Sequence, residues 1–213
     1  MENSRIAELL RPFVATNQIR PELLDQLGLY LDLLLKWNAR MSLTAVRDPE
    51  RIVTRHFGES LFAARTLFAD NSDAITLADV GSGAGFPGVP IKLWAPKIQL
   101  TLIESQNKKA TFLREVIRAL QVDGVEVFCG RAEQWGQTAD VVTLRAVEKF
   151  ESVLPVAADF VSAEGRICLL VGEKQIPKAQ QLLGNTWHWQ DPSAIPQSED
   201  RVVAIANKLQ KTP

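Results

Sequence analysis

The stretch that decides the fold runs from residue 77 to residue 88, Leu77-Ala78-Asp79-Val80-Gly81-Ser82-Gly83-Ala84-Gly85-Phe86-Pro87-Gly88. The apolar residues at its start predict a buried β-strand, and the glycines that follow predict a turn. Because glycine has no Cβ, such a turn lets the backbone approach a ligand closely. We therefore expect a ligand at the carboxyl end of this strand, with Gly81 and Gly83 beside it.

Outward from this turn, short apolar or β-branched runs alternate with helical ones. They predict strands at 75–80, 99–103, 124–128, 140–143, 166–171, 187–189 and 202–206, and helices at 107–121, 147–162 and 174–183. Pro87 is suited to begin one more helix. Strands that alternate with helices favour a parallel sheet covered on both faces. The sequence thus predicts a Rossmann-like α/β fold with a mainly parallel, seven-stranded sheet.

The region before this sheet reads as helical. Apolar residues recur at intervals of three and four from residue 22 to residue 37, and a second helical stretch begins near Asp48-Pro49. We expect two parts: a helical N-terminal region at 1–70 that packs on the sheet and shapes a substrate site, and the Rossmann-like domain at 71–213.

Composition limits the function classes. The 213 residues are 46% hydrophobic, and 24 basic against 25 acidic residues give a net charge of −1, so nucleic-acid binding would need a local patch. The N-terminus lacks the features of a secretory signal, and no apolar run is long enough to span a bilayer. Cys129 and Cys168 lie far apart in the sequence, each in an apolar run. We therefore expect both to be reduced, buried thiols. We expect a cytoplasmic protein.

Two cofactor classes fit the glycine turn. Residues 83–88 satisfy the G-x-G-x-x-G pattern of nicotinamide-binding folds. However, Asp79 would repel a pyrophosphate, whereas its carboxylate suits the charged amino acid end of S-adenosylmethionine. Pro87 also removes one N–H from a phosphate cradle. Glu104, at the end of the next strand, is placed to accept hydrogen bonds from ribose hydroxyls in either class. We favour S-adenosylmethionine.

Two later strand ends add candidates. Arg131-Ala132-Glu133 follows the third predicted strand, where the backbone around Ala132 and Glu133 could read the adenine edge; alternatively, Glu133 simply begins a solvated helix. Arg145 follows the fourth predicted strand at the same edge as the glycine turn. It is either a structural ion pair or a substrate contact, and its position at the edge favours contact.

These motifs together resemble the bacterial RsmG (GidB) family of small-subunit ribosomal RNA methyltransferases. The resemblance is carried by segments spread over nearly the whole chain: Leu35-x-Trp37-Asn38, Ser42-Leu43-Thr44, Arg55-His56, Ser60-Leu61, Asp79–Gly88, Thr101–Ser105, Lys108-Lys109, Phe112-Leu113, Arg131–Glu133 and Arg145–Val147. Three positions depart from the family pattern, namely Glu59, Leu144 and the segment Val171–Lys174.

The resemblance implies a class I S-adenosylmethionine-dependent methyltransferase that methylates N7 of a guanosine in the 530 loop of 16S ribosomal RNA. It also implies that Gly81, Phe86, Ala132, Glu133 and Arg145 line the cofactor site. Phe86 would cover the cofactor or pack on the next helix.

The chemistry needs few protein groups. Guanine N7 carries a lone pair and no proton, so methyl transfer to it requires alignment rather than a general base. We therefore expect no catalytic side chain that exchanges protons, no metal and no nucleophilic cysteine. Because the edge of guanine that bears N7 is hidden in A-form RNA, the target would lie in a loop or be unstacked.

Basic residues cluster on either side of the glycine turn. The segment from Lys36 to Arg65 contains six basic and three acidic residues, and the segment from Lys92 to Arg118 contains six basic and two acidic residues. We expect Arg55, His56, Lys108 and Lys109 to contact RNA if the fold brings both segments to one face. Otherwise the arginines form a solvated face and His56 is a packing residue. The near-neutral net charge favours a 30S subunit or an assembly intermediate as substrate. We also expect the protein to act as a monomer.

Two other functions remain open at this point. One is a non-catalytic RNA-binding or ribosome-assembly protein that keeps the fold, and the other is a small-molecule methyltransferase. The first would bind RNA without turning over the cofactor, and the second would methylate isolated small substrates in a closed pocket. The basic segments argue against the second.

Overall fold

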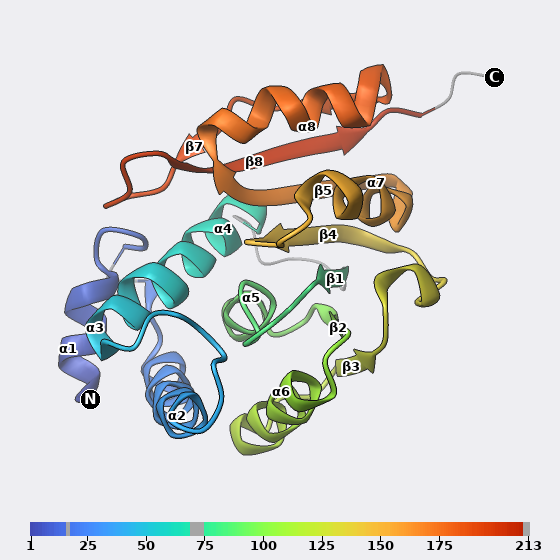
Figure 1. Ribbon diagram of the computed structural model, residues 1–213. Helices are drawn as coiled ribbons and strands as arrows, with labels where there is room; N and C mark the ends of the chain where they lie inside the picture. The colour runs from blue at the N-terminus through green and yellow to red at the C-terminus, as the bar shows by residue number, and fades with distance from the viewer. Residues whose placement is uncertain (16–17, 69–74, 211–213) are drawn as a thin grey trace.

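The computed structural model describes residues 1–15, 18–68 and 75–210. Its strands are β1 (Thr76–Val80), β2 (Gln99–Glu104), β3 (Val125–Cys129), β4 (Ala139–Arg145), β5 (Val161–Gly172), β6 (Trp187–Trp189), β7 (Ser193–Ala194) and β8 (Arg201–Lys208). They form one sheet in the order β3-β2-β1-β4-β5-β8-β6, and β7 pairs with β8 (Figure 1). The seven predicted strands are confirmed. The eighth, β7, has only two residues and is too short to show a periodic pattern.

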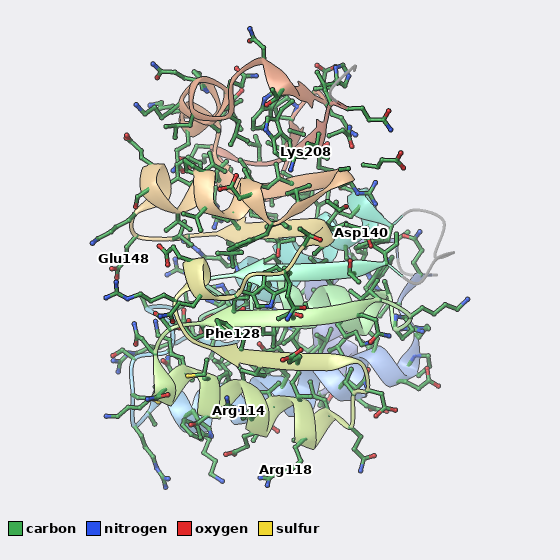
Figure 2. All side chains as sticks on the ribbon, turned by 90° about the vertical axis from the view of Figure 1, so that its right-hand side faces the viewer. Arg114, Arg118, Phe128, Asp140, Glu148 and Lys208 are labelled. Carbon is green, nitrogen blue, oxygen red and sulfur yellow. The ribbon has the colours of Figure 1, made fainter. Side chains whose placement is uncertain are left out.

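The strand directions create a site edge. β1 pairs in parallel with both β2 and β4, so that Val80 lies beside Ile103 and Leu144. Among the described strands, β8 alone runs antiparallel to its neighbours, which are β5, β6 and β7 at the far side. The chain moves outward from β1 to β3 and then returns to the other side of β1, which makes the β1–β4 boundary the switch point where open α/β sheets bind ligands. In Figure 2, Glu148 marks this carboxyl edge and Asp140 the opposite one.

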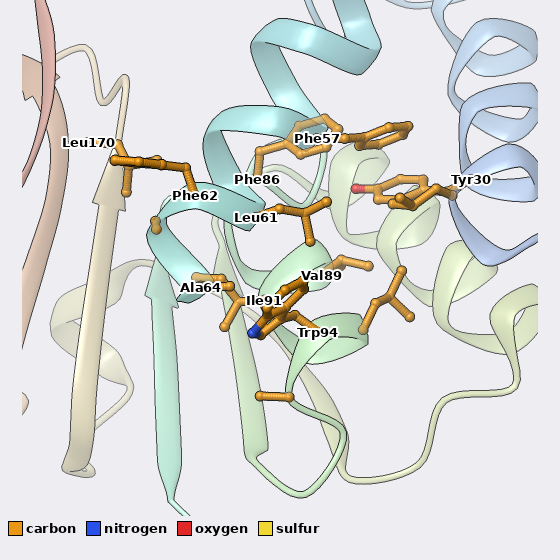
Figure 3. Packing of buried hydrophobic residues seen from close by; sticks show 14 of the residues in the cluster. Tyr30, Phe57, Leu61, Phe62, Ala64, Phe86, Val89, Ile91, Trp94 and Leu170 are labelled. Carbon is orange, nitrogen blue, oxygen red and sulfur yellow. The ribbon is translucent and has the colours of Figure 1, made fainter. Parts of the chain in front are cut away.

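The sheet separates two hydrophobic cores. Side chains alternate along a strand, so Leu77 joins the core on one face while Ala78 and Val80 join the core on the other. Figure 3 shows part of the first core, in which Tyr30, Phe57 and Phe86 lie close together. Helices α4, α5 and α6 cover this face, and α7 and α8 cover the other (Figure 1). These helices are α4 (Glu59–Leu67), α5 (Gly88–Trp94), α6 (Asn107–Leu120), α7 (Phe150–Asp159) and α8 (Ile176–Leu183), with short 3-10 turns η3 (Ala132–Gln134), η4 (Glu173–Gln175) and η5 (Gly184–Thr186).

The N-terminal region is helical as predicted. It comprises α1 (Asn3–Leu10), α2 (Pro21–Asn38), α3 (Pro49–Ile52) and the π-helix η2 (Val53–Gly58), which runs on into α4. Asp48 caps α3, because its Oδ1 accepts a hydrogen bond from Arg51 N at 2.8 Å. Tyr30 and Phe57 from this region are buried in the same core as Leu77 of β1. The boundary that we expect between residues 70 and 71 lies outside the described residues.

One predicted helix begins later than expected. We predict it from residue 147, but α7 starts at Phe150. Ala146 has a φ of +50°, so the chain leaves β4 through a left-handed turn before it can become helical. This turn places residues 146–149 at the site edge.

Within the described parts of the chain, no helix is both long enough and apolar enough to cross a membrane. The same residues contain no group of three His, Cys, Asp or Glu side chains arranged to hold a metal ion. Cys129 and Cys168 are both free, and Cys168 is buried.

Candidate functional site

The glycine turn leaves β1 at the carboxyl edge. Gly81 and Gly83 have φ values of +72° and +57°, a region that side-chain-bearing residues rarely adopt. A Cβ built on Gly83 would meet no atom closer than the Gly81 carbonyl oxygen at 3.8 Å. Gly83 therefore presents bare backbone to open space, as close approach of a ligand requires.

Glu104 joins this turn to the next strand. Its Oε2 accepts a hydrogen bond from Gly83 N at 2.9 Å, and its Oε1 accepts one from Gln106 N at 2.7 Å. The side chain is buried at the end of β2. Each carboxylate oxygen has a second lone pair, so Glu104 remains able to accept hydroxyl hydrogen bonds.

Asp79 lies beneath the turn. Its Oδ1 accepts a hydrogen bond from Thr143 Oγ1 at 2.7 Å and its Oδ2 accepts one from Gly88 N at 3.2 Å. Burial raises the pKa of this carboxyl to about 6, against the opposing effect of the hydrogen bonds. A Cβ on Gly88 would come within 2.9 Å of Asp79 Cβ, so glycine is needed there. Asp79 is buried and does not line the cavity described below. Our expectation that it meets the charged end of the cofactor therefore stays a prediction.

Phe86 belongs to the core and also reaches the site. Its ring is stacked between Tyr30, with centroids 5.4 Å apart, and His56, with centroids 4.8 Å apart. It therefore packs on α2 and η2, and it belongs to the same core cluster as Val89 and Ile91 of α5. Tyr30 also donates a hydrogen bond to the Ala84 carbonyl oxygen. The N-terminal helices thus hold the glycine turn in position.

Arg145 connects β4 to the N-terminal region. Its Nη2 lies 3.0 Å from Glu59 Oε2, 2.7 Å from the Arg55 carbonyl oxygen and 3.1 Å from His56 Nδ1. Glu59 is buried, and its second oxygen, Oε1, lies 2.5 Å from Arg201 Nη2 at the start of β8. We predicted either a structural ion pair or a substrate contact for Arg145, and the structure shows the ion pair with Glu59. Arg145 also lines the cavity described below, so a contact with a ligand stays a prediction.

His56 is fixed at both ring nitrogens. Nδ1 lies 3.1 Å from Arg145 Nη2, and Nε2 lies 2.8 Å from Thr44 Oγ1. Burial and the nearby Arg145 and Arg55 lower the pKa of His56 to about 2, so the ring is neutral at physiological pH. The π-helix supplies this residue, and such helical irregularities often occur at functional sites.

These side chains border a cavity of about 610 Å³, a size typical of small-molecule sites. Its lining residues come from the N-terminal region, the glycine turn, the carboxyl ends of β2, β4 and β5, the first turns of α6 and α7, η4 and the start of β8. They are Leu43, Thr44, Arg55, His56, Glu59, Gly81–Ala84, Phe86, Glu104–Gln106, Lys109, Arg145–Phe150, Val153, Leu170–Gly172, Gln175 and Arg201. The fold therefore brings the first basic segment, the glycine turn and Arg145 to one hollow.

Some predicted residues lie outside this lining. Ala132 and Glu133 form η3 after β3, where Ala132 packs against the second core and Glu133 is exposed. The turn before them adjoins Glu104, because Gly130 N donates a hydrogen bond to the Glu104 carbonyl oxygen at 3.1 Å. Lys108 is exposed on the first turn of α6, next to Lys109.

A second hollow of about 690 Å³ shares the Arg55, Glu59 and Arg201 wall. Arg51 lines it, so arginines border both hollows. Not every basic residue counted in the two basic segments lies on the surface. Lys92 is buried, and its Nζ donates to the Pro96 and Ile98 carbonyl oxygens at 2.8 and 2.6 Å, so this lysine does not face a polyanion.

Sequence reasoning assigned no role to four residues of this arrangement. Tyr30 is predicted only as one apolar position of a helix, and Arg201 lies just before the strand predicted at 202–206. Thr44 appears only within the family resemblance, and Glu59 only as a departure from the family pattern. Tyr30 binds Ala84, which is 54 residues away, and Arg201 pairs with Glu59, which is 142 residues away. Thr44 lies in an irregular segment and contacts His56. No local sequence pattern could identify such contacts.

The profile of a family described as "GidB: rRNA small subunit methyltransferase G" matches residues 23–195. A ribosomal RNA small subunit methyltransferase G of Streptococcus agalactiae is 33% identical over 200 residues, which cover 88% of this chain and 84% of the relative. One from Exiguobacterium is 33% identical over 226 residues, which cover 100% and 93%. Magnesium protoporphyrin IX methyltransferase from Synechocystis, solved with bound S-adenosylmethionine, has a TM-score of 0.66 at 14% identity over 86% of this chain and 97% of that one. This last likeness shows the class I methyltransferase fold.

Proposed function

The chain belongs to the GidB family, rRNA small subunit methyltransferase G, and from this premise we propose that it methylates N7 of a guanosine in the 530 loop of 16S ribosomal RNA. Its cofactor is S-adenosylmethionine, and the activity is that of a methyltransferase acting on ribosomal RNA. One observation carries the proposal: a single cavity has the glycine turn and Glu104 on one side and Thr44, Arg55 and His56 on the other. Such a cavity can take a cofactor and a nucleotide base together.

The residues on the first side fit the cofactor. Gly83 exposes backbone where a Cβ would project into the cavity, and Glu104 holds a carboxylate there that can accept ribose hydroxyls. Gly81 and Phe86 complete this wall. We place the adenine ring toward Ala132 and Glu133, because the turn that precedes them is hydrogen bonded to Glu104. Asp79 acts indirectly, by anchoring Gly88 at the end of the turn.

S-adenosylmethionine, when bound, supplies an electrophilic methyl group. The protein's task is to align the acceptor base, since N7 has no proton to lose. His56 fits this view, because both of its ring nitrogens are already engaged and the ring is neutral. It serves as a wall of the base site and not as a general base. Arg145 supports that wall through His56.

The RNA backbone would lie along the arginine-lined side. Arg55 is exposed at the border of both hollows, and Arg51 lines the second. On the first turn of α6, Lys109 lines the cavity and its neighbour Lys108 is exposed. These cations can contact phosphates on both sides of an unstacked guanosine. The overall net charge of −1 favours an assembled 30S subunit, in which RNA shape contributes to recognition.

The test follows labelled methyl from S-adenosylmethionine into three acceptors: 30S subunits from a strain that lacks this gene, naked 16S RNA, and a set of free nucleosides. We expect label in the subunits. Label only in free nucleosides would favour a small-molecule methyltransferase, and RNA binding without label would favour a non-catalytic assembly role.

A further inference from the structure

The Thr44 hydroxyl has an unusual set of neighbours. Its Oγ1 lies 3.1 Å from Val46 N and 2.8 Å from His56 Nε2, and Thr44 borders the 610 Å³ cavity. A threonine hydroxyl can donate one hydrogen bond and accept two. Val46 N–H donates to it, which fills one of the two acceptor positions.

The second position is decided by Arg145. The two hydrogens of Arg145 Nη2 are shared among the Arg55 carbonyl oxygen, Glu59 Oε2 and His56 Nδ1. An arginine side chain is a cation that cannot accept a hydrogen bond, so a proton on His56 Nδ1 would point at a positive charge, and Nδ1 presents its lone pair to Arg145 instead. In a neutral imidazole the other nitrogen then carries the proton. We assign this tautomer, in which His56 Nε2–H donates to Thr44 Oγ1. Both acceptor positions of the hydroxyl are therefore filled, and only its O–H remains available.

No acceptor for that O–H occurs among the side chains and backbone groups of 1–15, 18–68 and 75–210. Thr44 therefore offers the cavity a hydrogen-bond donor that cannot act as an acceptor. The chain of contacts from Arg145 through His56 maintains this polarity. An isolated threonine, by contrast, would accept or donate with equal ease.

Guanine and adenine differ at the position next to N7. Guanine presents the O6 acceptor there, whereas adenine presents the N6 amino donor. We propose that the Thr44 hydroxyl donates to O6 of the target guanine and thereby selects guanine over adenine. This inference rests on the proposed function, since it takes N7 as the methylated atom. N7 stays free, because the hydroxyl binds the neighbouring atom on the same edge.

The test changes the base and the residue together. The 30S subunits are reconstituted with 16S RNA that carries guanine or 2-aminopurine at the target position; 2-aminopurine keeps N7 and lacks O6. Methylation of each is measured for the wild-type protein, Thr44→Val and the control Thr44→Ser. Titration with S-adenosylmethionine checks that each variant binds its cofactor.

We expect 2-aminopurine to lower kcat/KM of the wild-type protein about tenfold more than that of Thr44→Val, the scale of one hydrogen bond. The intrinsic difference between the two bases affects both proteins equally and cancels. On guanine, Thr44→Val loses about tenfold, while Thr44→Ser stays near the wild type.

Equal sensitivity of the wild type and Thr44→Val to 2-aminopurine would overturn this inference alone. If Thr44→Val fails to bind its cofactor, Thr44→Ala, which also removes the hydroxyl, takes its place in the same comparison. Failure of the wild type to methylate guanine-bearing subunits would overturn the proposed function as well. The two failures are therefore distinguishable.

Discussion

Glu59 and Arg145 form a buried ion pair, with Glu59 Oε2 3.0 Å from Arg145 Nη2, and this pair joins the N-terminal helices to the end of β4. Both side chains are less than one-tenth exposed, at 3% and 9%. Removal of one partner leaves an uncompensated charge in a poorly solvated place. The two parts of the chain are thus connected electrostatically at the site itself.

The first prediction concerns this pair. Glu59→Gln should lower the free energy of unfolding by about 3 kcal/mol, because Arg145 and Arg201 lose their counter-charge. The control is Glu50→Gln, which breaks an exposed pair with Arg5 and should lower the free energy of unfolding much less than Glu59→Gln does, because water and salt screen exposed charges. Urea unfolding measures both. Equal losses for the two variants would contradict the role of burial.

The second prediction concerns the glycine turn. Gly83→Ala should abolish S-adenosylmethionine binding, because the added Cβ enters the cavity. It should lower the free energy of unfolding by only about 1–2 kcal/mol, the cost of a side chain at a positive φ. Gly136→Ala is the matched control: Gly136 also has a positive φ, +65°, and no atom near its Cβ position, but it does not line the cavity.

Calorimetric titration separates the two glycine variants. Gly136→Ala should show a similar loss of stability and wild-type affinity for the cofactor. Wild-type affinity in Gly83→Ala would mean that the cofactor lies elsewhere.

The third prediction is a pH dependence that comes from His56. Its pKa is lowered from 6.5 to about 2 in the folded protein. Well above pH 6.5 the ring is neutral in both the folded and the unfolded protein, so its titration does not change the free energy of unfolding. Below pH 6.5 the unfolded chain takes up a proton that the folded protein does not, so the free energy of unfolding falls as the pH falls. Between pH 7 and pH 5 this loss amounts to about 2 kcal/mol.

Variants isolate this effect from other titrating groups, including Asp79. The loss between pH 7 and pH 5 should shrink in His56→Gln, whose side-chain amide can donate and accept hydrogen bonds but does not titrate. It should persist in His188→Gln, because His188, the other histidine, is exposed on β6. An unchanged pH profile in His56→Gln would show that the ring is not buried and neutral.

The fourth prediction concerns RNA binding. Arg55→Ala combined with Lys108→Ala should weaken binding of 16S RNA and reduce its salt dependence by roughly 0.7 to 0.9 log units per log unit of salt for each lost phosphate contact. Affinity for S-adenosylmethionine should not change. Arg114→Ala combined with Arg118→Ala removes the same charge from the outer face of α6, away from the edge that Glu148 marks (Figure 2), and should leave the salt slope near the wild-type value.

The fold was predictable because it rests on local patterns. The glycine-rich turn after Val80 and the alternation of apolar runs with helical ones specify a parallel sheet and the edge where its ligand binds. Gly83 and Glu104 could be assigned to that edge for the same reason, since each directly follows or ends a strand. The helices at 21–38 and 107–120 follow from apolar periodicity.

The contacts within the site could not be predicted in this way. Asp79 points into the protein because Thr143, on the neighbouring strand, supplies a donor, and that register exists only in the folded sheet. Arg201 reaches Glu59 across 142 residues. Lys92 is buried and does not contribute to the basic surface, because its Nζ donates hydrogen bonds to the carbonyl oxygens of Pro96 and Ile98. Each of these outcomes depends on tertiary neighbours and not on local sequence.

The most direct test of the central claim locates the methyl group. The purified protein and S-adenosylmethionine are incubated with 30S subunits from a strain that lacks this gene, and the 16S RNA is then digested with nuclease and analysed by mass spectrometry. We expect a single new 7-methylguanosine, in the 530 loop. A methyl group on another atom or in another part of the RNA, or none at all, would contradict the account.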